Sequence, residues 1–287
     1  MEQKLKIAGQ FDIEGTVSGI APVGNGLIND TYSVTTAETN TPDYILQRIN
    51  HHIFKDVELL QRNIQRVTDH IRAKLEASGE SDIDRKALKL VPAKDGKLYH
   101  FDGENYWRMT VMIPRSVTHE TMTPALAEQT GMAFGNFQSQ LSDLPEGALG
   151  ETIPNFHNTP DRYRAFLETL ERDPMRRAAQ VQPEIEFALA RQSEMAALQT
   201  ALKAGELPLR VTHNDTKLNN VLLDAKTRKA LCVIDLDTVM PGSSLYDFGD
   251  SIRFGAATAA EDEKDLSKMT IDLELYRIFT RGFLTAC

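Results

Sequence analysis

The stretch formed by residues 211–238 constrains the fold more than any other part of the chain. It contains two short apolar runs, Val221–Leu223 and Leu231–Ile234, which have the composition of β-strands. The polar segment between them predicts a hairpin turn. When this hairpin closes, Asn220 before the first strand and Asp235 after the second come to the same end of the strand pair. An amide oxygen and a carboxylate placed there are suited to holding a metal ion.

The loop before the hairpin carries polar residues at a fixed spacing. His213, Asp215, Lys217 and Asn220 form the pattern H-x-D-x-K-x-x-N. A lone H-x-D is common, and an aspartate after a strand is often a simple turn residue. Together with the two aspartates that follow the second strand, however, six polar residues stand in order around one hairpin. This order favours a functional site over a structural turn.

The pattern resembles the catalytic loop of the protein-kinase-like fold. In that fold the position of Asp215 receives the proton of the acceptor hydroxyl, and the position of Asn220 holds Mg²⁺. Asp235 resembles the second metal-binding residue, although Leu-Asp follows it here in place of Phe-Gly. The resemblance implies that Asn220 and Asp235 bind Mg²⁺, that Asp215 is the catalytic base, and that Lys217 steadies the γ-phosphate of ATP.

The details of the motif resemble the aminoglycoside phosphotransferase family of small-molecule kinases rather than protein kinases. Asn214 precedes Asp215, and the metal strand has the form I-D-x-D. Over residues 211–256, the runs HNDTKLNNVLLD, VIDLDTVMPG and DFGDSIRFG are most similar to N-acetylhexosamine 1-kinases within that family. The resemblance covers most of the chain. It implies a two-lobed α+β fold, with an N-terminal antiparallel sheet and one helix, a mainly helical C-terminal lobe, and ATP and Mg²⁺ in the cleft.

Composition narrows the function classes. The chain has 287 residues and 41% hydrophobic content, enough for one large domain or two lobes. Its formal net charge of −9 argues against nucleic acid or an anionic membrane as a partner. Two cysteines provide no disulfide framework, and Cys232 in an apolar strand is expected to be buried. We see no signal peptide and no membrane span, so a cytoplasmic location is expected, while the oligomeric state stays open.

The N-terminal part is expected to form a meander of antiparallel strands over 15–23, 31–36 and 44–49. A glycine turn with Gly24, Gly26 and Asn29 joins the first two. Glycines let the backbone approach a phosphate closely, so this turn is a candidate nucleotide loop. It departs from G-x-G-x-x-G, since Asn29 stands where the last glycine would be, and an ordinary hairpin turn is the alternative.

Arg48 stands on the third strand where the fold usually keeps a phosphate-binding lysine. Gln47 precedes it, and the two side chains should point to opposite faces of the sheet. Arg48 is therefore a candidate for the ATP phosphates, with a solvated strand arginine as the alternative. A helix capped by Asp56 follows and ends at Gly79, and Glu58 in its first turn is the candidate partner of the strand cation.

Two further strands, Lys97–Phe101 and Tyr106–Ile113, complete a predicted five-stranded sheet. Val111 and Ile113 belong to the connector whose backbone is expected to hold the adenine edge. The N-terminal nucleotide-binding lobe is placed at 1–113 and the catalytic and acceptor lobe at 114–287. Helices are expected at about 124–141, 160–178 and 183–204.

The C-terminal part carries further candidates. Asp247 is expected to brace the catalytic loop by accepting its N–H groups, and Arg253 is expected to pair with Asp247 or to face the acceptor. The loop 150–155 is a candidate part of the acceptor site. Only 50 residues follow Asp237, so the C-terminus is expected to be shortened relative to this family.

The expected reaction is transfer of the γ-phosphate of ATP to a small-molecule hydroxyl. The resemblance favours the anomeric hydroxyl of an N-acetylhexosamine, with a sugar 1-phosphate as product. Two alternatives stay open at this point. One is a kinase of another alcohol, such as an aminoglycoside, choline or homoserine, and the other is a nucleotide-binding protein with impaired catalysis.

Overall fold

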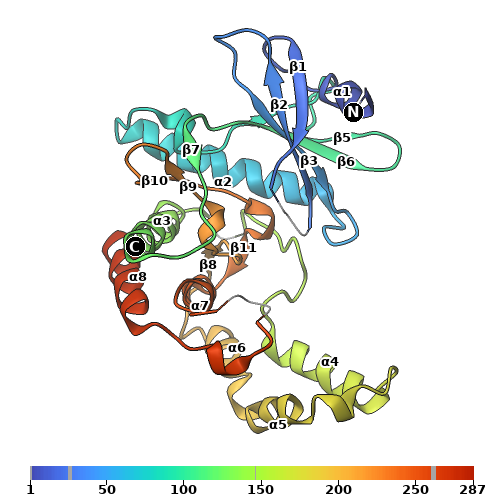
Figure 1. Ribbon diagram of the computed structural model, residues 1–287, viewed down its shortest axis with the longest axis vertical. Coiled ribbons are helices and arrows are strands. Elements are labelled where there is room, and N and C mark those ends of the chain that lie inside the picture. Colours follow the sequence, from blue (N-terminus) through green and yellow to red (C-terminus); the bar gives the residue numbers. More distant parts are fainter. Residues whose placement is uncertain (1, 25–27, 146, 260–262) are drawn as a thin grey trace.

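The computed structural model describes residues 2–24, 28–145, 147–259 and 263–287. An antiparallel sheet with two helices forms the N-terminal part, and a larger helical part lies below it (Figure 1). The long helix α2 runs beneath the sheet, between the two parts. Gly26 lies outside the described residues. Among the described helices, none is long and apolar enough to cross a membrane.

The N-terminal sheet has six strands in the order β1-β2-β3-β6-β4, and β5 also pairs with β6. The strands are β1 Val17–Pro22, β2 Asp30–Thr36, β3 Tyr44–Ile49, β4 Leu90–Val91, β5 His100–Phe101 and β6 Tyr106–Val111. The prediction of five strands was wrong because β4 was missed. A two-residue strand is too short to show an alternating pattern, and only its pairing with β6 defines it.

Each face of this sheet packs on a different helix. Tyr44 and Leu46 share one face of β3 and belong to a buried cluster with Ile7 of α1 (Glu2–Ala8). Ile49 points to the other face and packs with Leu60 of α2 (Val57–Ala77). The predicted Asp56 cap is confirmed, since its Oδ1 accepts the N–H of Leu59 at 2.8 Å.

The C-terminal part contains six α-helices among the described residues. They are α3 Pro124–Gln140, α4 Thr159–Arg172, α5 Gln182–Ala190, α6 Ala197–Lys203, α7 Ser244–Gly255 and α8 Leu273–Ala286. The prediction for 124–141 is confirmed, but a single helix over 183–204 is wrong. A short 3₁₀ turn, Gln192–Glu194, separates α5 from α6. The predicted helix over 160–178 is too long, because Asp173 takes a left-handed conformation and ends α4.

The predicted hairpin is confirmed. β9 (Val221–Asp224) and β10 (Ala230–Val233) pair antiparallel, and β7 (Ser116–Val117) extends this small sheet. A separate two-stranded sheet joins β8 (Arg210–Thr212) to β11 (Met240–Gly242). The segment between β8 and β9 is therefore held at both ends by strands.

Glycines allow α3 and α8 to pack with their backbones in close approach. A Cβ atom on Gly131 or Gly135 would meet the carbonyl oxygen of Phe279 or Phe283 of α8. In the same way, a Cβ on Gly282 would lie 2.6 Å from the carbonyl oxygen of Glu128. Because the obstacles are backbone atoms of another helix, they cannot move away as a flexible side chain would.

We therefore expect Gly135→Ala to reduce the free energy of unfolding by about 1–3 kcal/mol, the usual effect of overpacking. Gly249→Ala on α7 is the matched control, because a Cβ there meets nothing within 4 Å. Better helix propensity should leave Gly249→Ala unchanged or more stable by up to about 1 kcal/mol. Urea denaturation of the three proteins measures both effects, and equal stability of the two variants would contradict this account of the α3–α8 contact.

Candidate active site

The loop between β8 and β9 brings three predicted catalytic and metal-binding residues together. Asn220 donates its Nδ2 to Asp215 Oδ2 at 3.0 Å and to the Asp215 carbonyl at 2.8 Å. Lys217 Nζ lies 3.3 Å from Asp215 Oδ1. The Asp215 side chain keeps 33% of its surface exposed. Its carboxylate is thus oriented by two neighbours while it remains accessible to a substrate.

Asp235 lies beside this cluster because the hairpin is closed. The Ile234 N–H donates to the Asn220 carbonyl at 2.9 Å, which ties the end of β10 to the start of β9. Asp235 then takes a left-handed conformation with φ 58°, unusual for a residue other than glycine and typical of functional sites. Protein atoms surround Asp235 closely, although part of its surface stays open to solvent. Loss of water and the negative charge of Asp237 raise the pKa of Asp235 to about 6.

A divalent cation fits this pair as part of a metal–nucleotide complex. Since the Asn220 amide group donates to Asp215, its oxygen is the atom left to act as a ligand. In the described part of the chain, no group of three or more His, Cys, Asp or Glu side chains is placed to hold a metal ion. Mg²⁺ is commonly held by one or two protein ligands, substrate phosphates and water, so the arrangement suits that ion without a complete protein cage.

Asp247 braces the loop, as predicted. It is fully buried on α7, and its carboxylate accepts the N–H groups of His213 at 2.9 Å and Asn214 at 2.8 Å. Gln138 of α3 donates to the same carboxylate. Burial raises the pKa of Asp247, while these donors and His213 oppose the shift. Arg253 binds Asp250 at 2.8 Å rather than Asp247, so that alternative for Arg253 was wrong.

His213 is a structural residue of the loop. Its Nδ1 accepts the N–H of Asp215 at 3.3 Å, so its Nε2 carries the proton and donates to the Ile234 carbonyl at 2.8 Å. The ring meets Phe134 and Phe137 edge-on, at centroid distances of 5.6 and 5.7 Å. Both ring nitrogens are therefore occupied in holding the loop against the hairpin.

A buried ion pair joins the sheet to the segment that follows Asp235. Arg108 of β6 binds Asp237, and the two side chains are only 5% and 4% exposed. Arg108 Nε donates to Gln47 Oε1 at 2.8 Å, and Asn29 Nδ2 donates to Asp237 Oδ2 at 2.6 Å. Asp237 is thus engaged by Arg108 of the sheet and by Asn29, which directly precedes β2.

Arg48 lies elsewhere. It shares the sheet face of Leu46 and pairs with Asp30, with a distance of 2.7 Å from Nε to Oδ2. Gln47 and Arg108 occupy the opposite face, the one that reaches Asp237. Glu58 is exposed on α2 and makes no ion pair within the described residues, so the predicted pairing of Glu58 with Arg48 was wrong.

The remaining nucleotide candidates take different positions. Gly24 follows β1 with a φ of +73°, which suits a tight turn. Asn29 is buried, and its Oδ1 accepts a hydrogen bond from the Asn50 N–H at 2.9 Å. Together with its bond to Asp237, this contact connects the end of β3 to the segment after Asp235. Val111 and Ile113 lie on the connector between the two parts. The Val111 N–H donates a hydrogen bond to the Lys89 carbonyl. The Ile113 carbonyl accepts a hydrogen bond from the Ser116 hydroxyl at 2.8 Å.

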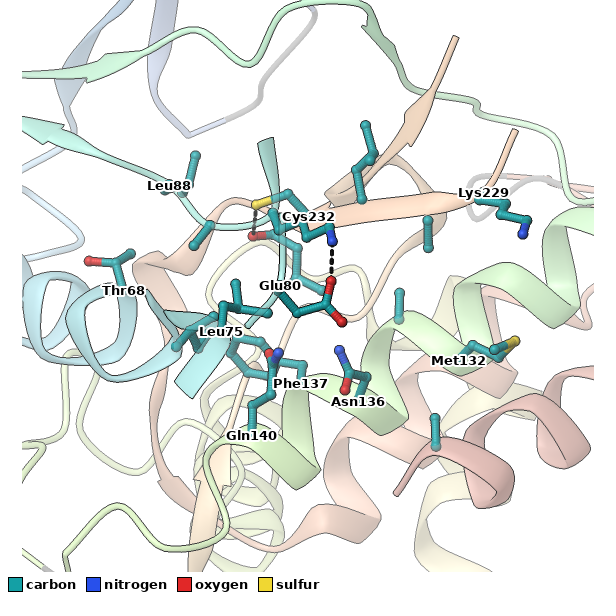
Figure 2. A pocket seen from close by; sticks show the side chains of 18 of the residues that line it. Thr68, Leu75, Glu80, Leu88, Met132, Asn136, Phe137, Gln140, Lys229 and Cys232 are labelled. Carbon is teal, nitrogen blue, oxygen red and sulfur yellow. Dashed lines mark hydrogen bonds and ion pairs between the residues drawn. The ribbon is translucent and has the colours of Figure 1, made fainter. Parts of the chain in front are cut away.

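A cavity of about 400 Å³ lies outside this cluster, between α2, α3 and β10 (Figure 2). Its wall includes Leu75, Phe137 and Cys232. Glu80 and Lys86 also line it and form an ion pair with each other. Burial raises the pKa of Cys232 to about 12, so this thiol stays protonated and behaves as the small buried hydrophobe expected. Neither the β8–β9 loop nor Asp235 lines the cavity.

Residues 19–267 match the phosphotransferase enzyme family. The chain belongs to this family. Solved structures of the same architecture include a microcompartment-associated aminopropanol kinase, with a TM-score of 0.59 and 18% identity over 100% of this chain and 81% of the other. An amicoumacin kinase solved with AMP-PNP and Ca²⁺ has a TM-score of 0.62 and 15% identity over 99% of this chain and 77% of the other. A spectinomycin phosphotransferase solved with ADP has a TM-score of 0.58 and 15% identity over 98% and 79%.

These likenesses confirm the predicted protein-kinase-like α+β fold, with its N-terminal antiparallel sheet and mainly helical C-terminal lobe. Family membership also supports the coarser functional prediction, a small-molecule phosphotransferase. Sequence reasoning missed Arg108 in this phosphotransferase. A cation in the middle of an apolar strand was a visible signal, but its partner, Asp237, lies 129 residues further along the chain.

The Arg108–Asp237 pair generates a stability prediction. Arg108→Gln leaves the Asp237 carboxylate buried without its cation, so we expect the free energy of unfolding to fall by about 3–5 kcal/mol. Arg48→Gln removes the same charge from a more exposed pair and should cost no more than about 1 kcal/mol. Chemical denaturation of both variants measures the difference, and similar losses would show that the buried pair is not the stronger link.

Proposed function

We propose that this phosphotransferase moves the γ-phosphoryl group of ATP, with Mg²⁺, to the anomeric hydroxyl of an N-acetylhexosamine. The observation that carries the phosphotransfer is the cluster of Asp215, Asn220 and Asp235 at one end of the β9–β10 hairpin. It combines an accessible carboxylate with an amide oxygen and a second carboxylate. These are the groups needed to receive a proton and to hold a divalent cation beside it.

Each residue of the cluster has a proposed role. Asp215 orients the acceptor hydroxyl and accepts its proton as the oxygen attacks the γ-phosphorus. The bond from the γ-phosphorus to the bridging oxygen breaks, and ADP leaves with that oxygen and its electron pair. Lys217, which already lies beside the Asp215 carboxylate, steadies the negative charge on the γ-phosphate. Asn220 and Asp235 hold Mg²⁺, which when bound neutralises charge on the phosphate oxygens. Most of the rate enhancement then comes from positioning and from electrostatic stabilisation.

The nucleotide contacts are proposed from the same geometry. Gly24 and the turn after it are the candidate phosphate loop, and the Val111–Ile113 connector is the candidate adenine contact. Arg48, proposed from its strand position, faces away from Asp237. We propose Arg108 in its place, because its guanidinium contacts Asp237, two positions after the proposed metal ligand Asp235.

The acceptor proposal has a chemical argument beside the resemblance. The anomeric hydroxyl is the most acidic hydroxyl of a sugar, so an accessible carboxylate such as Asp215 is a suitable acceptor for its proton. Kinases of amine-bearing alcohols occur among the structural neighbours, and such an acceptor is the alternative that the experiment must separate.

The test is product analysis by phosphorus and proton NMR, after incubation with ATP, Mg²⁺ and N-acetylglucosamine or N-acetylgalactosamine. We expect an α- or β-linked 1-phosphate, recognised by coupling of phosphorus to the anomeric proton. Phosphate on the 6-hydroxyl, or turnover only with an amino alcohol or an aminoglycoside, would refute the sugar 1-kinase proposal. If the protein binds ATP but phosphorylates none of these acceptors, the result would favour a nucleotide-binding protein with impaired catalysis.

Asp215→Asn tests the base. We expect turnover to fall by a factor of roughly 10²–10⁴, the usual contribution of a general base, because an amide cannot accept the proton. Binding of the metal–nucleotide complex should persist, as measured by calorimetry. Asp143→Asn removes an exposed carboxylate on the loop after α3 and serves as the matched control with unchanged turnover. Near-normal turnover of Asp215→Asn would remove Asp215 from the mechanism.

A further inference from the structure

A second pocket, of about 290 Å³, lies beside the catalytic loop. Asn214, the residue directly before Asp215, forms part of its wall. The other walls come from the segment that leads into α4, from α6, and from β11 with the start of α7. In Figure 1 this segment descends past β8 and β11 toward α4 and α6. The pocket therefore lies beside the residue that precedes the proposed base, on the side of α6.

An aromatic pair forms one side of this pocket. The rings of His157 and Tyr246 stack at a centroid distance of 4.6 Å and an interplanar angle of 25°. Gln199 of α6 holds the pair in place, since its Nε2 donates to the Tyr246 hydroxyl at 2.7 Å. Phe156 meets the His157 ring edge-on at 4.7 Å. Rigid rings of this kind provide an apolar platform that costs little conformational entropy when a ligand binds.

Two buried polar atoms of the pocket residues have no hydrogen-bond partner among the described residues. They are Nε2 of His157 and Oδ1 of Asn214. Asn214 is 4% exposed, and its Nδ2 is already committed to the carbonyls of Thr212 and Thr238. Unsatisfied buried polar atoms are uncommon in folded proteins and are frequently completed by water or a ligand. Burial lowers the pKa of His157, so its ring is neutral near pH 7 and pairs with a hydroxyl better than with an anion.

The charges around the pocket are balanced. Glu151 is the carboxylate and Lys203 the ammonium among its lining residues, and the other polar groups include the amides of Asn155, Asn158 and Gln199. A site for a polycationic aminoglycoside would need several carboxylates to neutralise the ligand. The pocket volume of about 290 Å³ is just below the common range of small-molecule sites, about 300–1,000 Å³, so it suits a small ligand.

We propose that this pocket is the acceptor subsite and that it takes a single neutral sugar ring. The ring packs on the His157–Tyr246 pair, and its hydroxyl or amide groups complete the hydrogen bonding of His157 Nε2 and Asn214 Oδ1. This inference rests on the proposed function for the reaction that follows, but it concerns binding, which is measured without turnover.

The experiment measures binding of N-acetylglucosamine by saturation-transfer NMR and calorimetry, in the full chain and without ATP. Cationic glucosamine serves as the comparison ligand. We expect the neutral sugar to bind more tightly than glucosamine. His157→Leu and Tyr246→Leu should each weaken its binding by about tenfold or more, since each removes a ring contact or a hydrogen bond. Phe187→Leu, which changes an exposed aromatic residue of α5 outside the pocket, is the matched control with unchanged affinity.

A conservative variant guards against loss of folding. Tyr246→Phe keeps the ring and loses only the hydroxyl bonded to Gln199, so it should retain sugar affinity within about threefold and the wild-type circular dichroism spectrum. Unchanged sugar affinity in both leucine variants, tighter binding of glucosamine, or no binding of any neutral sugar would overturn the subsite. Sugar binding that depends on His157 and Tyr246 without a sugar phosphate product would support the subsite and overturn the proposed function, so the two failures are distinguishable.

Discussion

The β8–β9 loop, which carries the proposed catalytic residues, depends on hydrogen bonds to the buried carboxylate of Asp247. Removed from water, this carboxylate is stabilised by donors alone, and two of these are the backbone N–H groups of His213 and Asn214. Directly after them, the chain turns Asp215 toward Asn220 and Lys217. Gln138 of α3 gives the third donor, so the loop is tied at once to α7 and α3. Helix α3, which carries Gln138, packs closely on α8, and this packing holds Gln138 in position.

A buried ion pair connects the N-terminal sheet to the segment that follows Asp235. Arg108 and Asp237 form an ion pair out of water, and Gln47 and Asn29 complete its hydrogen bonds. Such a pair adds little net stability compared with apolar packing, but removal of one partner is costly because the other charge stays buried. It also places a negative charge near Asp235, which is part of the reason that the pKa of Asp235 is raised. The same network thus links lobe arrangement to the electrostatics of the proposed metal site.

Loops and short helix segments form most of the wall of the proposed acceptor pocket. The segment after Gly150, the short helix α6 and the start of α7 meet beside Asn214 around a pocket with aromatic and amide groups. Asn63 of α2 binds the Gly150 carbonyl at 2.7 Å and the Val239 carbonyl at 3.1 Å, which fixes the origin of this segment against the loop after Asp235. A polar contact in the interior therefore positions a wall of the proposed sugar subsite.

The sequence by itself determined the features that depend on near neighbours. The β9–β10 hairpin, the cap and periodicity of α2, and the spacing of Asp215, Lys217 and Asn220 are all readable because strand alternation, helix period and turn chemistry act over a few residues. The role of Asp247 as a brace was also foreseen, since a buried carboxylate must find donors and the loop offered them.

Only the tertiary structure decided which partner each side chain of the sheet meets. Arg48 and Gln47 differ by one position, and the sheet turned Arg48 toward Asp30 and Gln47 toward Arg108. The two-residue strand β4, the break between α5 and α6, and the meeting of Arg108 with Asp237 likewise arise from contacts between distant segments. Such contacts leave no periodic trace in the chain, because their energy comes from burial and pairing that exist only once the lobes are packed together.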